Sequence, residues 1–131
     1  MIIDASALLA VLLDEPERPS FEAAIARDPF PRLSAASYLE TGIVVDSRRD
    51  PIRSRYLDSF LASAEVAIEP VTAEQAAIAR KAYQDFGRNS GHPAKLNFGD
   101  CFSYALAKAY DEELLFKGDD FSHTDIQSAA T

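Results

Sequence analysis

Short runs of apolar residues alternate along the chain with longer stretches in which apolar residues recur every three or four positions. The short runs are typical of strands buried inside a sheet, and the longer pattern is typical of helices with one apolar face. Prolines, glycines and capping residues mark several of the boundaries. The expected strands cover residues 1–4, 32–34, 66–68 and 114–116. The expected helices cover residues 5–13, 19–27, 35–48, 51–61 and 72–86, and a sixth opens at Gly99 and Asp100.

The order of these elements predicts an α/β fold. Strands alternate with helices and no hairpin signal joins two neighbouring strands, so we expect a parallel sheet of four or five short strands with helices on both faces. Right-handed crossovers would bring the carboxyl ends of the strands to one edge. Open α/β sheets hold their ligands at that edge.

Helical spacing also predicts which side chains are buried. An acid on an apolar helix face, such as Glu40, needs a cation, a metal or a wet cleft, unless its side chain bends outward to water. Ser6 is expected to cap the first helix, and a place beside Asp4 is the alternative. The expected apolar faces comprise Leu39, Ile43 and Val44 in the third helix and Phe102, Ala105, Leu106 and Ala109 in the sixth.

Composition places the chain among ordinary folded proteins. Its 131 residues, 47% hydrophobic and 26% charged, predict one domain over residues 1–131 with a single sizeable core. The single cysteine, Cys101, excludes an internal disulfide, and the apolar run at residues 5–13 is too short to span a membrane, so we expect a cytoplasmic protein. The formal charge of −8 argues against affinity based mainly on neutralising phosphates.

Acids occupy informative places in four separate segments. Asp4 ends the first strand, and Asp119 and Asp120 follow the last one closely. Asp100 lies in the first turn of the sixth helix, where a carboxylate often serves only as a cap. Glu40 lies on the third helix. The predicted topology lets these acids converge at one edge of the sheet.

Several carboxylates at one place need compensation, because each negative charge raises the pKa of its neighbours. Oxygen ligands completed by water favour Mg²⁺ or Mn²⁺, and no cysteine and histidine spacing typical of zinc sites occurs. His92 and His123 are expected in loops. Such a metal site can activate water and neutralise a phosphoryl oxygen, so the pattern predicts metal-assisted phosphodiester hydrolysis.

Four segments, in this order, resemble the PIN-domain ribonucleases, and most closely the VapC toxins of type II toxin–antitoxin systems. The similarity covers essentially the whole chain. It implies a magnesium- or manganese-dependent endoribonuclease that acts on structured RNA such as transfer RNA, is silenced by a cognate VapB antitoxin, and is usually dimeric. The segments are Met1 to Ala7, Ser37 to Thr41, Asn97 to Cys101 and Leu114 to Phe121.

The resemblance also implies roles for single residues. Asp4 and Asp100 would be the principal metal ligands, and Glu40 would assist in metal binding or orient the water. The fourth acid would be Asp120, immediately before Phe121, although Asp119 fits a shifted turn. Ala5 departs from the family, which often has a hydroxyl residue after the first acid.

Basic and apolar surfaces suggest partners. Arg88 and Lys95 belong to a basic group that precedes Asp100, and Lys117 lies at the rim of the predicted site, so these three are the substrate-binding candidates. Solvated helix surface is the alternative. Apolar residues near 21–25 and 52–61 offer a groove for an amphipathic antitoxin helix, and core packing competes as their explanation.

Three other functions fit parts of the pattern. A receiver-type phosphotransfer domain needs an aspartate at the end of a central strand, which residues 66–70 do not supply, and a haloacid-type phosphatase needs a second aspartate after Asp4. A non-catalytic module whose acidic cleft receives a partner's arginines is the third hypothesis.

Overall fold

Four parallel strands form the centre of the protein in a computed structural model that describes residues 1–129. They are β1 (Ile2–Ile3), β2 (Arg32–Ser34), β3 (Ala67–Glu69) and β4 (Leu114–Leu115), in the spatial order β3-β2-β1-β4. The predicted α/β fold with a parallel sheet is confirmed. Residues 130 and 131 of the predicted domain lie outside the described residues.

Six helices connect and cover these strands, and their ends follow the capping signals. Asp50 accepts hydrogen bonds from the first turn of α4, Thr72 does the same for α5, and Gly87 follows the last residue of α5. The expected strand at residues 66–68 is shifted by one residue. The helices are α1 (Ala5–Leu12), α2 (Arg18–Arg27), α3 (Ala35–Ser47), α4 (Pro51–Ser63), α5 (Ala73–Phe86) and α6 (Phe98–Tyr110), followed by a short 3₁₀ helix, η1 (Asp120–His123).

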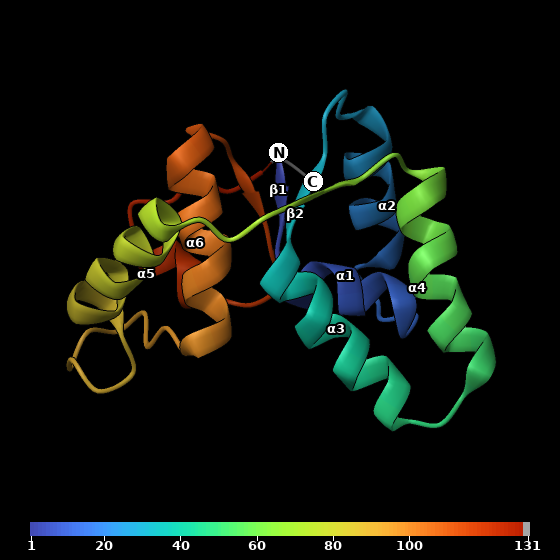
Figure 1. Cartoon of the computed structure of the whole chain (residues 1–131), viewed down its shortest axis with the longest axis horizontal. Coiled ribbons are helices and arrows are strands. Elements are labelled where there is room, and N and C mark those ends of the chain that lie inside the picture. Colours follow the sequence, from blue (N-terminus) through green and yellow to red (C-terminus); the bar gives the residue numbers. More distant parts are fainter. Residues whose placement is uncertain (130–131) are drawn as a thin grey trace.

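Neighbouring residues of one strand point to opposite faces of the sheet, which divides the core into two parts. Ile3 and Leu115 pack with α1, α2 and α4, whereas Ile2 and Leu114 pack with α5 and α6. Figure 1 shows these two helix layers on either side of the strands. Helix α3 contacts α1 and α4 and also α6, so it links the layers. Among residues 1–129, no helix combines the length and apolarity that crossing a membrane requires.

The predicted apolar face of α3 was wrong. Leu39 and Ile43 are 62% and 59% exposed, and the buried side of α3 instead carries Ser37, Thr41 and Val45. The polar side chains can be buried because their hydrogen bonds are satisfied: the Thr41 hydroxyl, for example, donates to the Ser37 carbonyl at 2.8 Å. Spacing of apolar residues alone could not reveal such a face.

The predicted stripe of α6 was only partly right. Ala105 and Leu106 are buried, but Phe102 is half-buried and Ala109 is exposed. Most side chains between Cys101 and Ala107 are buried, because α6 packs against α5, α3 and the sheet together. A helix enclosed on several sides has no single apolar stripe.

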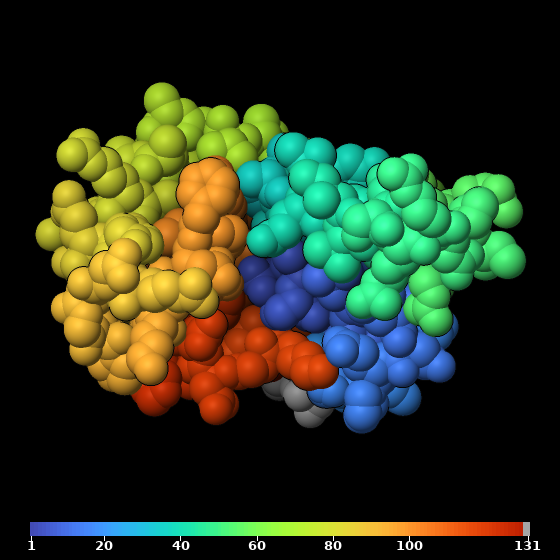
Figure 2. All heavy atoms as spheres, turned by 90° about the horizontal axis from the view of Figure 1, so that it is seen from below, coloured from blue at the N-terminus to red at the C-terminus, as the bar shows by residue number. Residues whose placement is uncertain are grey.

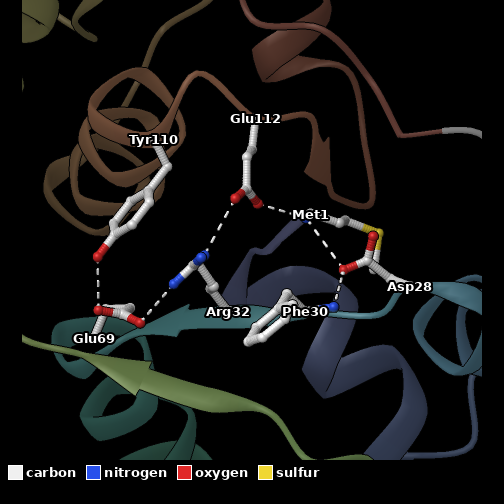
Figure 3. Close-up of polar contacts among 7 residues, drawn as sticks. All are labelled: Met1, Asp28, Phe30, Arg32, Glu69, Tyr110 and Glu112. Carbon is white, nitrogen blue, oxygen red and sulfur yellow. Dashed lines mark hydrogen bonds and ion pairs between the residues drawn. The ribbon is translucent and has the colours of Figure 1, made fainter.

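Opposite charges alternate at the amino-terminal edge of the sheet (Figure 3). Arg32 donates to Glu69 at 2.9 Å and to Glu112 at 3.2 Å, and its guanidinium lies 4.2 Å from the centre of the Tyr110 ring. The Tyr110 hydroxyl donates to Glu69 at 2.8 Å. These contacts join β2, β3 and the end of α6.

The amino group of Met1 extends this network. It donates to Glu112 at 2.6 Å and to Asp28 at 3.3 Å, and Asp28 also accepts from the backbone of Phe30 (Figure 3). Each acid drawn at this edge therefore has a cationic partner. We call this group the amino-edge network.

We expect Arg32→Ala to lower the free energy of unfolding by about 2 kcal/mol, because Glu69 and Glu112 would keep their charges and lose a half-buried partner. Chemical denaturation measures this change. The control is Arg27→Ala, which removes an exposed arginine at the end of α2 and is expected to change stability by less than about 0.5 kcal/mol. Equal effects of the two substitutions would contradict the importance of the network.

Candidate active site

Asp4 lies where β1 ends and α1 begins. Its backbone N–H donates to the Leu115 carbonyl at 2.9 Å, and its side chain, in a residue only 4% exposed, caps α1 by accepting from the Ser6 N–H at 3.0 Å. The expectation that Ser6 caps this helix was therefore wrong. The Ser6 hydroxyl donates to Asp4 at 2.6 Å and accepts from the Lys117 N–H at 3.0 Å, so it ties the first acid to the loop after β4.

Asp100 forms a capping box with Asn97 at the start of α6: each side chain accepts from the other residue's backbone N–H, at 3.0 and 2.9 Å. Burial raises the pKa of Asp100 to about 6, against the hydrogen bond from Asn97, and the charges of Asp4, Asp120 and Glu40 raise it further. Asp100 is thus both a cap and a member of an acidic group.

Glu40 reaches this group from α3. Its carboxylate lies against Gly99, and burial together with the charge of Asp4 raises its pKa. One helical turn from this contact, the buried hydroxyls of Ser37 and Ser103 share a hydrogen bond of 3.2 Å. This bond connects α3 directly to α6.

The two acids after β4 differ in their positions. Asp120 opens η1, and its charge acts on Asp100, whereas the charge of Asp119 is not among those that raise the Asp100 pKa. Phe121, which is buried, anchors η1 beside them. Of the two alternatives from the sequence, Asp120 is the one whose charge reaches the carboxyl group of Asp100.

These four side chains, Asp4, Glu40, Asp100 and Asp120, are called the carboxyl-edge acids below. Figure 2 shows the molecule from the carboxyl-terminal side of the sheet, where the first residues of the chain form the floor of a hollow. Helix α3, the start of α6 and the segment after β4 surround it.

The carboxyl-edge acids lack the charge pairing seen at the opposite edge. Within residues 1–129, none of the four forms an ion pair with a lysine, an arginine or a histidine. No three acidic, histidine or cysteine side chains of the described chain form a ready-made metal cage. Their oxygen donors fit a hydrated divalent ion that one or two carboxylates hold directly, as is usual for Mg²⁺.

Neither histidine forms an ion pair with these acids within residues 1–129. His92 packs edge-on against Phe86, with ring centres 5.0 Å apart, and accepts from the Ala94 N–H. His123 is exposed at the end of η1.

The basic candidates have different surroundings. The Lys117 ammonium pairs with Glu15 at 3.3 Å and Glu17 at 3.2 Å, so its charge is shared with acids at the rim. Lys95 is exposed in the loop before α6 and has a positive φ of 52°.

Arg88 lines an apolar groove of about 580 Å³ between α5 and α6. Arg80 is its other charged lining residue, and Phe98, which is 79% exposed, stands beside Gly99 at the end of the groove. Arg88 belongs to the basic group predicted from the sequence, but the groove itself was not predicted. The lining residues are Ala76, Ala79, Arg80, Tyr83, Arg88, Asn97, Phe98, Cys101 and Phe102.

The residues expected to form an antitoxin groove are mostly core residues. Phe21, Ile25, Leu57 and Leu61 are buried, so core packing explains them. Ile52, in contrast, is 72% exposed. A separate groove of about 450 Å³ lies between α2 and α4 and is edged by Glu22 of α2 and by Asp28 and Glu65 in the loops that follow α2 and α4.

Known sequences are similar to this chain over nearly its whole length. A family model described as "PIN domain" matches residues 1–127. Ribonuclease VapC28 of Mycobacterium tuberculosis is 58% identical over 129 residues, which cover 98% of this chain and 97% of that protein. Ribonuclease VapC42 of the same species is 46% identical, with full coverage of both chains.

Solved structures with low sequence identity share the fold. Mycobacterium tuberculosis VapC20, described as a sarcin-ricin loop cleaving toxin, has a TM-score of 0.74 at 19% identity and covers 95% of both chains. A toxin-antitoxin complex from Klebsiella pneumoniae has a TM-score of 0.66 at 18% identity, covering 92% of this chain and 89% of the other. At these identities the similarity shows the fold alone.

We expect Asp100→Asn to stabilise the metal-free protein by on the order of 1 kcal/mol at about pH 7.5. The raised pKa of Asp100, about 6, means that stability is lost as pH rises through that value, because the folded protein must then ionise the group among like charges. Asparagine keeps the acceptor for the Asn97 N–H and carries no charge.

Denaturation in the presence of a chelator measures this effect. The advantage of the variant should shrink as the pH falls below about 6 and should vanish near about pH 3, where the carboxyl group is mostly protonated in both the folded and the unfolded wild type. A variant that is less stable than wild type at the higher pH would contradict the electrostatic explanation.

Proposed function

The chain belongs to the PIN domain family, and from this premise we propose that its carboxyl-edge acids hold a divalent cation and hydrolyse RNA phosphodiester bonds. The family membership and the whole-length identity to VapC ribonucleases make the chain a ribonuclease toxin of the VapBC type. The single observation that supports the proposed site is the gathering of four acids without ion pairs in the described residues.

Asp4 and Asp100 are the proposed direct ligands. Both are fixed by helix N-terminal hydrogen bonds, Asp4 to Ser6 and Asp100 to Asn97, so little side-chain entropy would be lost on binding. A bound Mg²⁺ or Mn²⁺ would supply an activated water and neutralise charge on the phosphoryl group. The proposal covers either of these two ions.

Glu40 and Asp120 complete the site in this proposal. The raised pKa of Glu40, caused by burial and by Asp4, suits a group that orients the attacking water and takes up its proton. Asp120, on the exposed start of η1, can accept a hydrogen bond from a metal-bound water.

The proposed RNA contacts follow the positive charges near the site. Arg88 stands in the groove next to the start of α6, and Lys95 lies in the loop that leads to it, so both can meet phosphates that flank the cut. Lys117 would contact a phosphate more weakly, because its ammonium group already pairs with Glu15 and Glu17. Structured RNA, with transfer RNA as one example, is the proposed substrate class.

Protein partners are proposed on separate surfaces. A VapB-type antitoxin is the expected partner of a VapC toxin, and the groove between α2 and α4 is the proposed place for one of its helices. Leu39 and Ile43 form an exposed apolar pair on α3, which supports the proposal of a homodimer. A cytoplasmic location stays a prediction.

The other hypotheses lose support. The whole-length match to ribonucleases gives no reason to expect a receiver domain or a haloacid-type phosphatase. In addition, Glu69 at the end of β3 is held by Arg32 and Tyr110 and offers no free phosphate acceptor. A passive acidic module would also gain nothing from the raised pKa values of Glu40 and Asp100.

We expect the purified protein to cleave RNA with Mg²⁺ or Mn²⁺ and to lose this activity with EDTA. Asp4→Asn should lower the rate at least about a hundredfold, because charge stabilisation by a metal is worth several kcal/mol. Asparagine can still cap α1, so the fold is retained. Gel analysis of a defined RNA measures cleavage, and Asp46→Asn, which neutralises an exposed acid elsewhere on α3, is the control. Unimpaired cleavage by Asp4→Asn would refute the proposed site.

A matched pair of substitutions tests the fourth acid. We expect Asp120→Asn to reduce cleavage by roughly tenfold or more and Asp119→Asn to leave it within about twofold, because of these two acids only Asp120 acts electrostatically on Asp100. The two variants carry the same chemical change at adjacent exposed positions, which makes each the control for the other. The reverse order of effects would assign the role to Asp119.

A further inference from the structure

Gly99 lies in the first turn of α6, between the exposed Phe98 and the acid Asp100. A Cβ atom built on Gly99 would lie 2.9 Å from both Cδ and Oε1 of Glu40, and it would overlap Oε2. The space that a side chain at position 99 would fill is therefore occupied by the Glu40 carboxylate. No other glycine of the chain has this relation to an acid of the site.

The backbone does not require glycine at this position. Gly91 and Gly118 are the glycines with positive φ in the described chain, whereas Gly99 has ordinary helical geometry. Alanine has a higher helix propensity than glycine at such a position. A glycine here lowers the stability of the helix, so we look for its role in the space that its missing side chain leaves open.

The surrounding helices limit how a larger residue could be accommodated. The buried hydrogen bond between Ser37 and Ser103 holds α3 against α6 one turn away. The Glu40 carboxylate is the end of a flexible side chain. An added Cβ would therefore turn this side chain away and leave the helix packing in place.

We infer that Gly99 is a positioning residue, whose missing side chain lets Glu40 lie against the start of α6 beside Asp4 and Asp100. This inference rests on the proposed function, because Glu40 serves there as an acid of the metal site. The location of Glu40 at the positive end of α6 also favours its negative charge. Position 99 then controls the site although it contributes no chemical group.

The test is Gly99→Ala, compared with Gly42→Ala. Gly42 lies on α3 two residues after Glu40, and a Cβ there would meet only Leu57 at 3.8 Å, an ordinary contact. We expect Gly99→Ala to match or exceed wild type in stability, and to weaken Mn²⁺ binding measured by calorimetry by roughly tenfold. Its kcat for RNA cleavage should fall by at least about tenfold, with a smaller change in KM. Gly42→Ala should leave Mn²⁺ affinity and kcat unchanged.

A double-mutant cycle identifies the residue through which position 99 acts. In a Glu40→Ala background the space beside residue 99 is empty, so Gly99→Ala should cause no further loss of kcat or Mn²⁺ affinity. Additive effects in the cycle, or a Gly99→Ala protein with wild-type affinity and kcat, would overturn the inference. A loss of stability in Gly99→Ala would do the same, because it would indicate a packing role.

A crystal structure of metal-free Gly99→Ala separates this inference from the proposed function. We expect the Glu40 carboxylate to be displaced while the Ser37–Ser103 hydrogen bond is kept. An undisplaced carboxylate would overturn the inference whatever the activity. A wild-type protein that neither binds Mn²⁺ nor cleaves RNA would instead remove the proposed function.

Discussion

Repulsion between carboxylates at one edge of the sheet is the constraint on which the rest of the structure depends. Asp4, Glu40, Asp100 and Asp120 come from four segments and meet without an ion pair in the described chain, and burial adds to the cost of the charges on Glu40 and Asp100. The opposite edge shows that the same chain pairs acids readily, since the amino-edge network gives Glu112 two cationic partners, Arg32 and the Met1 amino group. The difference between the edges indicates that the unpaired charges serve function.

The frame that withstands this repulsion is small. Strands of two or three residues supply few hydrogen bonds, so side-chain contacts carry much of the positioning. The Ser6 hydroxyl connects Asp4 to the loop after β4, and the Ser37–Ser103 bond connects the helices that carry Glu40 and Asp100. Ser6 holds the Asp4 carboxylate and the Asn97 N–H holds that of Asp100, and these neutral groups leave both charges uncompensated. A cation that binds there relieves the repulsion and stabilises the fold at the same time.

The sequence predicted those features that local patterns determine. The strand ends, the helix caps at Asp50 and Thr72 and the parallel sheet all follow from short-range signals, and they were sufficient to bring Asp4 and Asp120 to one edge. The face of α3 could not be predicted, because burial of Ser37 and Thr41 depends on hydrogen bonds rather than on apolar character. The contact between Glu40 and residue 99 joins segments almost sixty positions apart, and the spacing of residues contains no signal for it.

Charge separation within an acidic protein explains how it can act on a polyanion. With a net charge of −8, the surface as a whole repels RNA, and the grooves between α2 and α4 and beside Asp50 are lined partly by acids. The groove between α5 and α6 has only arginines among its charged lining residues, and it begins where Asn97 starts the helix that carries Asp100. RNA therefore has one favourable approach on this side of the molecule, and a metal ion at the carboxyl edge would extend the positive potential to the cut. Metal binding, RNA affinity and the positions of the acids are then coupled through the same few charges, so changes that move a carboxylate without removing it should affect catalysis more than stability.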